Sequence, residues 1–184
     1  MSQSELHLVS EALARVIVTS IQNACGDSIK EDVRRQRLVT QNSVPTRIWD
    51  LLNTALYENA PLYNCTAETT KRGPWQMLLI FDPHSGLLFN IMRETRFKEL
   101  CRCAPSKRKY HYLPCLTSAL NQDLIAGEKQ VQMEQVGEVD LDFDIVHKIV
   151  TSMLHDLRLS EDVVRHHALV LFMPPGLRCS LCGV

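Results

Sequence analysis

The sequence contains little glycine, with only seven glycines in 184 residues. It has no Gly-rich phosphate-binding loop, no GxSxG nucleophile elbow and no HExxH pair. These motifs carry the chemistry of nucleotide-driven enzymes and of common hydrolases. Their absence weighs against both classes of enzyme.

Long apolar runs are also absent. No stretch of 18 apolar residues occurs, which is about the length that a membrane-spanning helix needs. The N-terminal segment MSQSELHLVSEALARVIV is too short in its apolar part, and too interrupted by charge, for a signal peptide. We therefore expect a cytoplasmic protein without a membrane partner.

Cysteine and charge set further limits. Seven cysteines are an odd number, so we expect reduced and mostly buried thiols and no disulfide framework. The 20 Lys and Arg balance 21 Asp and Glu, and a net charge of -1 provides no overall attraction to nucleic acid or to an anionic membrane. Any binding of this kind requires a local patch.

Apolar residues recur at helical spacing in three segments, which are residues 4–24, 46–60 and 141–159. Shorter helices are expected at 93–102 and 114–124. The segment 27–45 is dense in charge and has no clear period, so it predicts a solvated connection with room for a short helical turn. The polar segment 61–74 is expected to be a loop.

Two apolar runs, WQMLLIF and LLFNIM, flank the turn-forming residues DPHSG and predict a β-hairpin over residues 75–92. Both runs are nearly continuous, so the hairpin is expected to be central and covered on both faces. Further strands are expected at 128–136, at 163–173 and after the Pro-Pro-Gly bend. The pattern predicts a single α+β domain, with an N-terminal helical part (4–57) and a sheet-containing part (74–184). Its sheet is mixed and mostly antiparallel, with about five strands packed against helices.

Asp82 and Glu94 lie twelve residues apart near the ends of the two hairpin strands, and Arg96 follows. This arrangement resembles a degraded acidic pair of the PD-(D/E)XK nuclease family. The resemblance implies catalytic residues Asp82, Glu94 and Arg96, with a divalent metal such as Mg²⁺ that activates water. Arg96 stands where the family has Lys, and Asp82 falls in the turn. The alternative is that both carboxylates have ordinary roles in a turn and at a helix start.

Four cysteines form two closely spaced pairs, Cys101-x-Cys103 and Cys179-x-x-Cys182. Tetrahedral zinc accepts paired thiolates from two knuckles, so these residues are candidates for a structural zinc site. The alternative is a set of buried free cysteines, because alternation along a strand sends Cys179 and Cys182 to opposite faces.

The histidines do not form an obvious metal site. His166 and His167 are neighbours on an expected strand and point to opposite faces. His147 and His155 are separated by roughly 12 Å along a helix, which is too far for one metal ion. We expect these histidines at polar edges of the fold.

Two basic clusters remain. One contains Arg34, Arg35 and Arg37. In the other, Lys98 precedes a cluster of cations interleaved with aromatic rings, which contains the candidate binding residues Arg102, Lys107, Arg108, Lys109, Tyr110 and Tyr112, together with His111. Such a loop can bind phosphates and stack on bases. The alternative is a solvated charged loop.

These observations favour a cytosolic binding protein that works by stoichiometric contact with a macromolecule, as an accessory, an inhibitor or a toxin-type component. We expect another protein as the partner, and nucleic acid as the alternative through the basic and aromatic loop. No cofactor is expected; the alternatives are structural zinc and Mg²⁺. The competing function is that of a metal-dependent nuclease using Asp82 and Glu94.

Overall fold

The computed structural model describes residues 9–37, 39–40, 42–72, 75–104, 106, 111–127 and 142–173. Within these residues four strands form one sheet in the order β1-β2-β3-β4. The strands are β1 (Thr66–Arg72), β2 (Trp75–Asp82), β3 (Leu87–Arg93) and β4 (His166–Phe172). The first three strands pair antiparallel, and β4 pairs parallel with β3.

The α+β class and the mixed, mostly antiparallel sheet are confirmed, with four strands in the described part where about five were expected. The strands predicted at 128–136 and after the Pro-Pro-Gly bend lie outside the described residues. None of the described helices combines the length and the apolar character that crossing a lipid bilayer requires.

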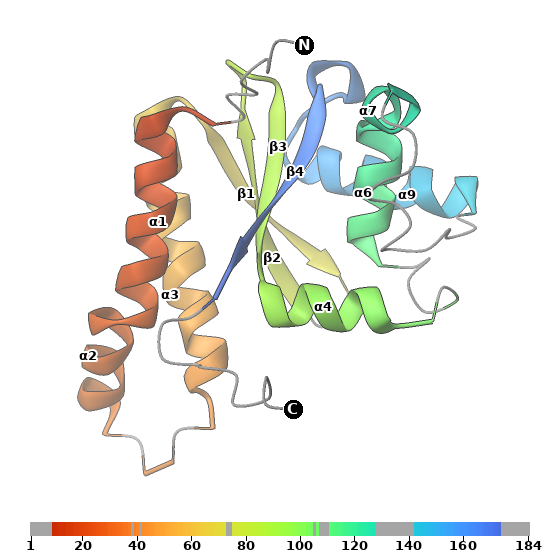
Figure 1. The fold of residues 1–184 in the computed structure, drawn as a ribbon. Coiled ribbons are helices and arrows are strands. Elements are labelled where there is room, and N and C mark those ends of the chain that lie inside the picture. The colour runs from red at the N-terminus through yellow and green to blue at the C-terminus, as the bar shows by residue number, and fades with distance from the viewer. Residues whose placement is uncertain are drawn as a thin grey trace.

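Helices cover both faces of the sheet (Figure 1). The helices are α1 (Glu11–Cys25), α2 (Asp27–Gln36), α3 (Val44–Asn59), α4 (Glu94–Arg102), α6 (Tyr112–Leu120), α7 (Gln122–Gly127) and α9 (Phe143–Asp156), with short 3-10 turns η1 (Ala60–Tyr63) and η2 (Glu161–Val163). Figure 1 shows α1 and α3 on one side of the sheet, α6 and α9 on the other, and α4 across its lower end.

The hairpin strands separate two hydrophobic cores. Alternate residues such as Ile80 and Phe89 pack against α1 and α3, while Leu79 and Leu88 pack against α6 and α9. Successive side chains of a strand point to opposite faces, so a strand buried on both faces needs a nearly continuous apolar run. The predicted central position of the hairpin is therefore confirmed.

The segment predicted as a solvated connection is instead the ten-residue helix α2. Its fully buried residues are Ile29 and Asp32, so one of the two is a carboxylate. Asp32 pairs with Arg47 of α3, and this contact takes the place of an apolar stripe. Because the contact that anchors α2 is polar, hydrophobic periodicity did not reveal the helix.

The expected loop 61–74 contains the edge strand β1. Its outward residues are polar, and its buried positions include Ala67 and Thr70. The Thr70 hydroxyl donates a hydrogen bond of 2.6 Å to Asp156 at the end of α9. An edge strand that is mostly polar has no apolar pattern of its own. Only its pairing with β2 identifies it as a strand, and a single sequence does not show that pairing.

Candidate partner-binding groove

The two acidic residues of the nuclease prediction lie at opposite ends of one hairpin. Asp82 pairs with Leu87 beside the turn, whereas Glu94 follows the far end of the seven-residue strand β3. A strand of this length separates the two positions by roughly 20 Å. Asp82 and Glu94 are therefore not brought together, and they do not form a shared metal site.

Each of these charged residues has local partners. The Asp82 carboxylate is buried and accepts hydrogen bonds of 2.9 Å from the His84 backbone N–H and from the Ser85 hydroxyl. Glu94 lies 2.5 Å from the Lys98 ammonium, and Arg96 lies 3.1 Å from Glu99. These are the turn and helix roles of the alternative interpretation.

The zinc prediction falls partly outside the described residues. Cys101 and Cys103 lie half-buried at the end of α4, while Cys179 and Cys182 are not described. Among the described residues no group of three or more His, Cys, Asp or Glu side chains is placed to hold a metal ion. The four-thiolate zinc site stays a prediction.

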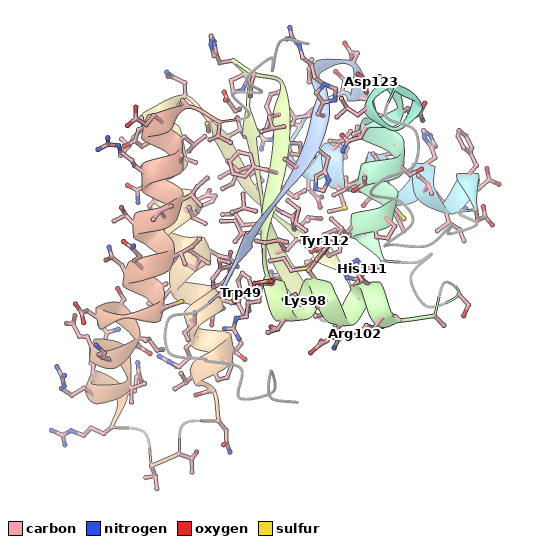
Figure 2. All side chains as sticks on the ribbon, in the orientation of Figure 1. Trp49, Lys98, Arg102, His111, Tyr112 and Asp123 are labelled. Carbon is pink, nitrogen blue, oxygen red and sulfur yellow. The ribbon has the colours of Figure 1, made fainter. Side chains whose placement is uncertain are left out.

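The basic and aromatic cluster is also described only in part. Arg102 is exposed on α4, and Lys98 is exposed but paired with Glu94 (Figure 2). Residues 107–110 lie outside the described part. Tyr112, predicted as an exposed loop residue, is instead the first residue of α6, and its side chain is mostly buried.

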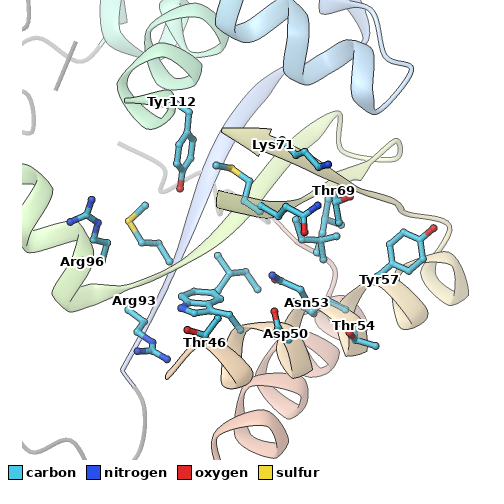
Figure 3. A pocket seen from close by; sticks show the side chains of 18 of the residues that line it. Thr46, Asp50, Asn53, Thr54, Tyr57, Thr69, Lys71, Arg93, Arg96 and Tyr112 are labelled. Carbon is cyan, nitrogen blue, oxygen red and sulfur yellow. The ribbon is translucent and has the colours of Figure 1, made fainter. Parts of the chain in front are cut away.

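A groove of about 1810 Å³ runs along one end of the sheet, from α3 to α4 and α6 (Figure 3). Sites for small molecules usually enclose about 300 to 1,000 Å³. The groove therefore has the dimensions of a site for a segment of a macromolecule.

The groove carries both signs of charge, with four carboxylates and three permanent cations. Its carboxylates are Asp50, Glu58, Glu68 and Glu99, and its permanent cations are Lys71, Arg93 and Arg96. Binding to a nucleic-acid backbone depends on an excess of Lys and Arg. The lining also includes the amides of Asn53 and Gln76 and the rings of Trp49 and Tyr57, a mixture typical of protein interfaces.

Arg93 contacts residues of α3 at one end of the groove. Its guanidinium carbon lies 5.4 Å from the centre of the Trp49 ring, and its Nη2 atom donates a hydrogen bond of 3.1 Å to the Pro45 carbonyl. The Trp49 ring in turn meets Phe172 edge-on at 5.5 Å. A cation stacked on an aromatic face and anchored to a carbonyl loses little freedom when it binds an anion.

Tyr112 links the groove to a polar group inside the fold. Its hydroxyl accepts a hydrogen bond of 3.1 Å from the Asn90 amide, and Figure 3 shows this hydroxyl turned toward the groove. Burial raises the pKa of Tyr112 to about 12, so the phenol keeps its proton at neutral pH. It is a hydrogen-bond donor at the groove wall.

Behind Tyr112 lies a buried polar network centred on His167, which is 5% exposed. The Nε2 atom of His167 lies 3.1 Å from Asn90 Oδ1, and its Nδ1 atom lies 3.5 Å from the Thr117 hydroxyl. The Asn121 side chain bonds both the backbone N–H and the carbonyl of His167, at 2.7 and 2.9 Å. Burial lowers the pKa of His167 to about 4, so the imidazole is neutral and structural.

The expectation of polar-edge histidines was wrong for His167. Its neighbour His166 is half-buried, and its Nδ1 atom lies 3.6 Å from Asp123 of α7. The sequence did contain a signal for this buried network, because each of the two strands has a polar residue within an apolar run. These residues are Asn90 in LLFNIM and His167 in HHALVLF. Sequence reasoning did not connect the two because their pairing depends on the parallel β3–β4 contact.

Comparison with known families matches residues 6–176 to the family described as "Family of unknown function (DUF5986)". The chain belongs to the DUF5986 family. No curated protein and no solved structure matches it. The part of the chain that matches DUF5986 includes every residue named here as lining the groove.

Proposed function

We propose that the protein is a binding protein that acts by stoichiometric contact with another protein, and that a segment of this partner occupies the groove. The observation that carries the proposal is the size of the groove together with its mixed lining. The groove exceeds what a metabolite fills, and it offers amides, hydroxyls, aromatic rings and both signs of charge.

The roles of the titratable residues support a binding function. Asp82 fixes a turn, Glu94 pairs with Lys98, and the buried His167 is held neutral by its surroundings. A general acid or base works best with a pKa near the operating pH and within reach of a substrate. These three side chains are committed to the fold.

Tyr57 provides a specific test, because it lines the groove on α3 and is 47% exposed. The change Tyr57→Arg places a long charged side chain in the groove at a tolerant position. Val18 on α1 is 51% exposed and does not line the groove, so Val18→Arg is a matched control.

The experiment is affinity capture from a nuclease-treated extract of the native source, with the captured proteins quantified against the bait. The wild type and Val18→Arg are expected to retain the same protein at about one copy per chain, and Tyr57→Arg is expected to lose it. Thermal melting checks that all three baits are folded. Absence of a stoichiometric protein, or equal capture by Tyr57→Arg, contradicts the proposal. A partner that is captured from a parallel extract without nuclease, and is lost after nuclease treatment, assigns binding to nucleic acid instead.

A further inference from the structure

A second, smaller cavity of about 370 Å³ lies among α1, α2 and α3, which pack against one another on one side of the sheet (Figure 1). Its volume is within the range of small-molecule sites, about 300 to 1,000 Å³. It shares Asp50, Thr54 and Glu58 with the groove, and its other lining residues are its own. We propose that this cavity, the helix cavity, binds a linear aliphatic polyamine. The proposal does not depend on the partner-binding function of the groove.

The helix cavity is long and narrow. Its lining follows α3 from Arg47 to Glu58, which corresponds to roughly 16 Å along the helix axis. Ala24, Leu51 and Ala55 supply apolar surface along it. A small volume spread over this length suits a linear chain better than a ring system, and the apolar surface suits methylene groups.

The charges of the helix cavity favour a cationic ligand. Its described lining contains the carboxylates of Asp32, Asp50 and Glu58 and one guanidinium, that of Arg47. Arg47 is bonded to Asp32, so the charges of these two residues offset each other. Asp50 and Glu58 are both exposed, and neither forms a salt bridge within the part of the chain that the structure describes. Two carboxylates are therefore left to attract positive charge.

Ser20 indicates a ligand independently of these charges. It is 6% exposed and lines the helix cavity, and its hydroxyl makes no hydrogen bond to the described residues. In that part of the chain, the fully enclosed side-chain atoms that lack a partner are Arg93 Nε and His166 Nδ1. The Ser20 oxygen is not one of them, so it opens into the cavity. A buried hydroxyl costs free energy until it is paired, and an N–H group of a ligand can pair with it.

A linear polyamine satisfies all of these features. Asp50 and Glu58 are eight residues apart on α3, which is about 12 Å along the helix axis, so the two terminal ammonium groups of one chain can each approach a carboxylate. An inner secondary ammonium supplies the N–H donor for Ser20. A monoamine would leave one carboxylate without a cation, and a simple diamine would leave the Ser20 hydroxyl unpaired.

The test uses the 184-residue chain and three probes of equal chain length. Spermidine has an inner ammonium group, 1,8-diaminooctane has a methylene group in its place, and 1,8-octanediol also lacks the terminal charges. Isothermal titration calorimetry at low ionic strength measures the affinities, because salt screens exposed charges. Spermidine is expected to bind about tenfold more tightly than 1,8-diaminooctane, and the diol is expected not to saturate.

Three variants and one control assign the contacts. Ser20→Ala is expected to weaken binding of spermidine about tenfold and to leave 1,8-diaminooctane unchanged, because only spermidine presents an N–H to the hydroxyl. Asp50→Asn and Glu58→Gln are each expected to weaken binding of both amines about threefold to fivefold. Glu31→Gln removes an exposed carboxylate of α2 that does not line the helix cavity, so it is the matched control and is expected to change neither affinity. Thermal melting without ligand checks that every variant is folded.

Three outcomes overturn the proposal. Binding of the diol as tight as that of the amines would mean that apolar contact alone fills the cavity. An equal loss of affinity in Glu31→Gln and Glu58→Gln would mean that the amines are attracted to the acidic surface in general. Equal affinity of spermidine for the wild type and Ser20→Ala would mean that the ligand does not enter the helix cavity.

Discussion

The Nε2 atom of His167 lies 3.1 Å from Oδ1 of Asn90, and this contact joins the two parallel strands on the face covered by α6. The two residues are not opposite each other in the sheet, because His167 aligns with Leu88 and Asn90 aligns with Leu169. The contact is a diagonal bridge between polar side chains in an otherwise apolar layer. Each residue satisfies the other's hydrogen-bonding groups where water does not reach.

His167 makes stability depend on pH in a defined window. Burial lowers its pKa from 6.5 to about 4, so the unfolded chain takes up a proton near pH 6.5 while the folded chain resists it. The contribution of neutral His167 is fully present above pH 6.5 and decreases as pH falls toward 4. The loss of unfolding free energy at pH 4.5 is about 2 to 3 kcal/mol.

Urea denaturation at pH 7.5 and 4.5 measures this loss. A His167→Gln variant is less stable at pH 7.5 but is expected to show a smaller decrease at pH 4.5, because it cannot titrate. His155 is exposed on α9, and His155→Gln is expected to behave like the wild type. Equal pH dependence in the wild type and His167→Gln would show that His167 does not control the transition.

Asp82 is expected to act on stability through the hairpin turn. Its two carboxylate oxygens accept from the His84 N–H and the Ser85 hydroxyl at 2.9 Å, and Asp82→Ala removes both bonds. The expected loss of unfolding free energy is about 1 to 3 kcal/mol. His84→Ala is the matched control, since only its backbone donates. Chemical denaturation that found Asp82→Ala as stable as His84→Ala would be inconsistent with the turn role.

The sequence predicted those elements whose stability comes from apolar periodicity. The hairpin, α3 and α9 were found because each presents a clear apolar face or run. Helix α2 was missed because Asp32 and Arg47 anchor it, and β1 was missed because an edge strand depends on its neighbour. The local spacing of apolar residues does not indicate contacts between residues that are far apart in the sequence.

The groove was less accessible to sequence reasoning than the fold. Tyr112 was chosen for its basic surroundings, but its position on α6 and its bond to Asn90 place it at the groove wall. Trp49 and Arg93 are 44 residues apart and meet only because β3 ends beside α3. Asp82 and Glu94 show the opposite case, since two residues close in sequence lie at opposite ends of a strand.

Asp32 is expected to anchor α2 to α3. Its carboxylate accepts hydrogen bonds from Arg47 and, at 3.4 Å, from Arg35, and the bond from Arg47 lowers its pKa below the usual value of 3.8. This stabilisation is present above pH 3.8 and is lost as pH falls through the lowered pKa of the folded state. At neutral pH, Asp32→Asn removes the charge and is expected to speed amide exchange in α2 roughly tenfold.

Hydrogen exchange with fragment mass analysis measures this change. Asp27→Asn is the control, because the Asp27 side chain is 99% exposed and, within the part of the chain that the structure describes, pairs with Lys30 at the surface. Exchange in α9 is expected to stay unchanged in both variants. Protection of α2 that is identical in Asp32→Asn and the wild type would mean that apolar packing of Ile29 holds the helix.

Cys65 is expected to react slowly with alkylating agents. Burial, reinforced by the negative charge of Asp82, raises its pKa to about 11, so almost no thiolate forms at pH 8. Its alkylation by iodoacetamide is expected to be at least about 100-fold slower in the native protein than in urea, as measured by peptide mass spectrometry. Cys101, half-buried on α4, is the internal control and is expected to label faster than Cys65. Labelling of Cys65 at the rate of Cys101 would show that the end of β1 opens faster than its burial implies.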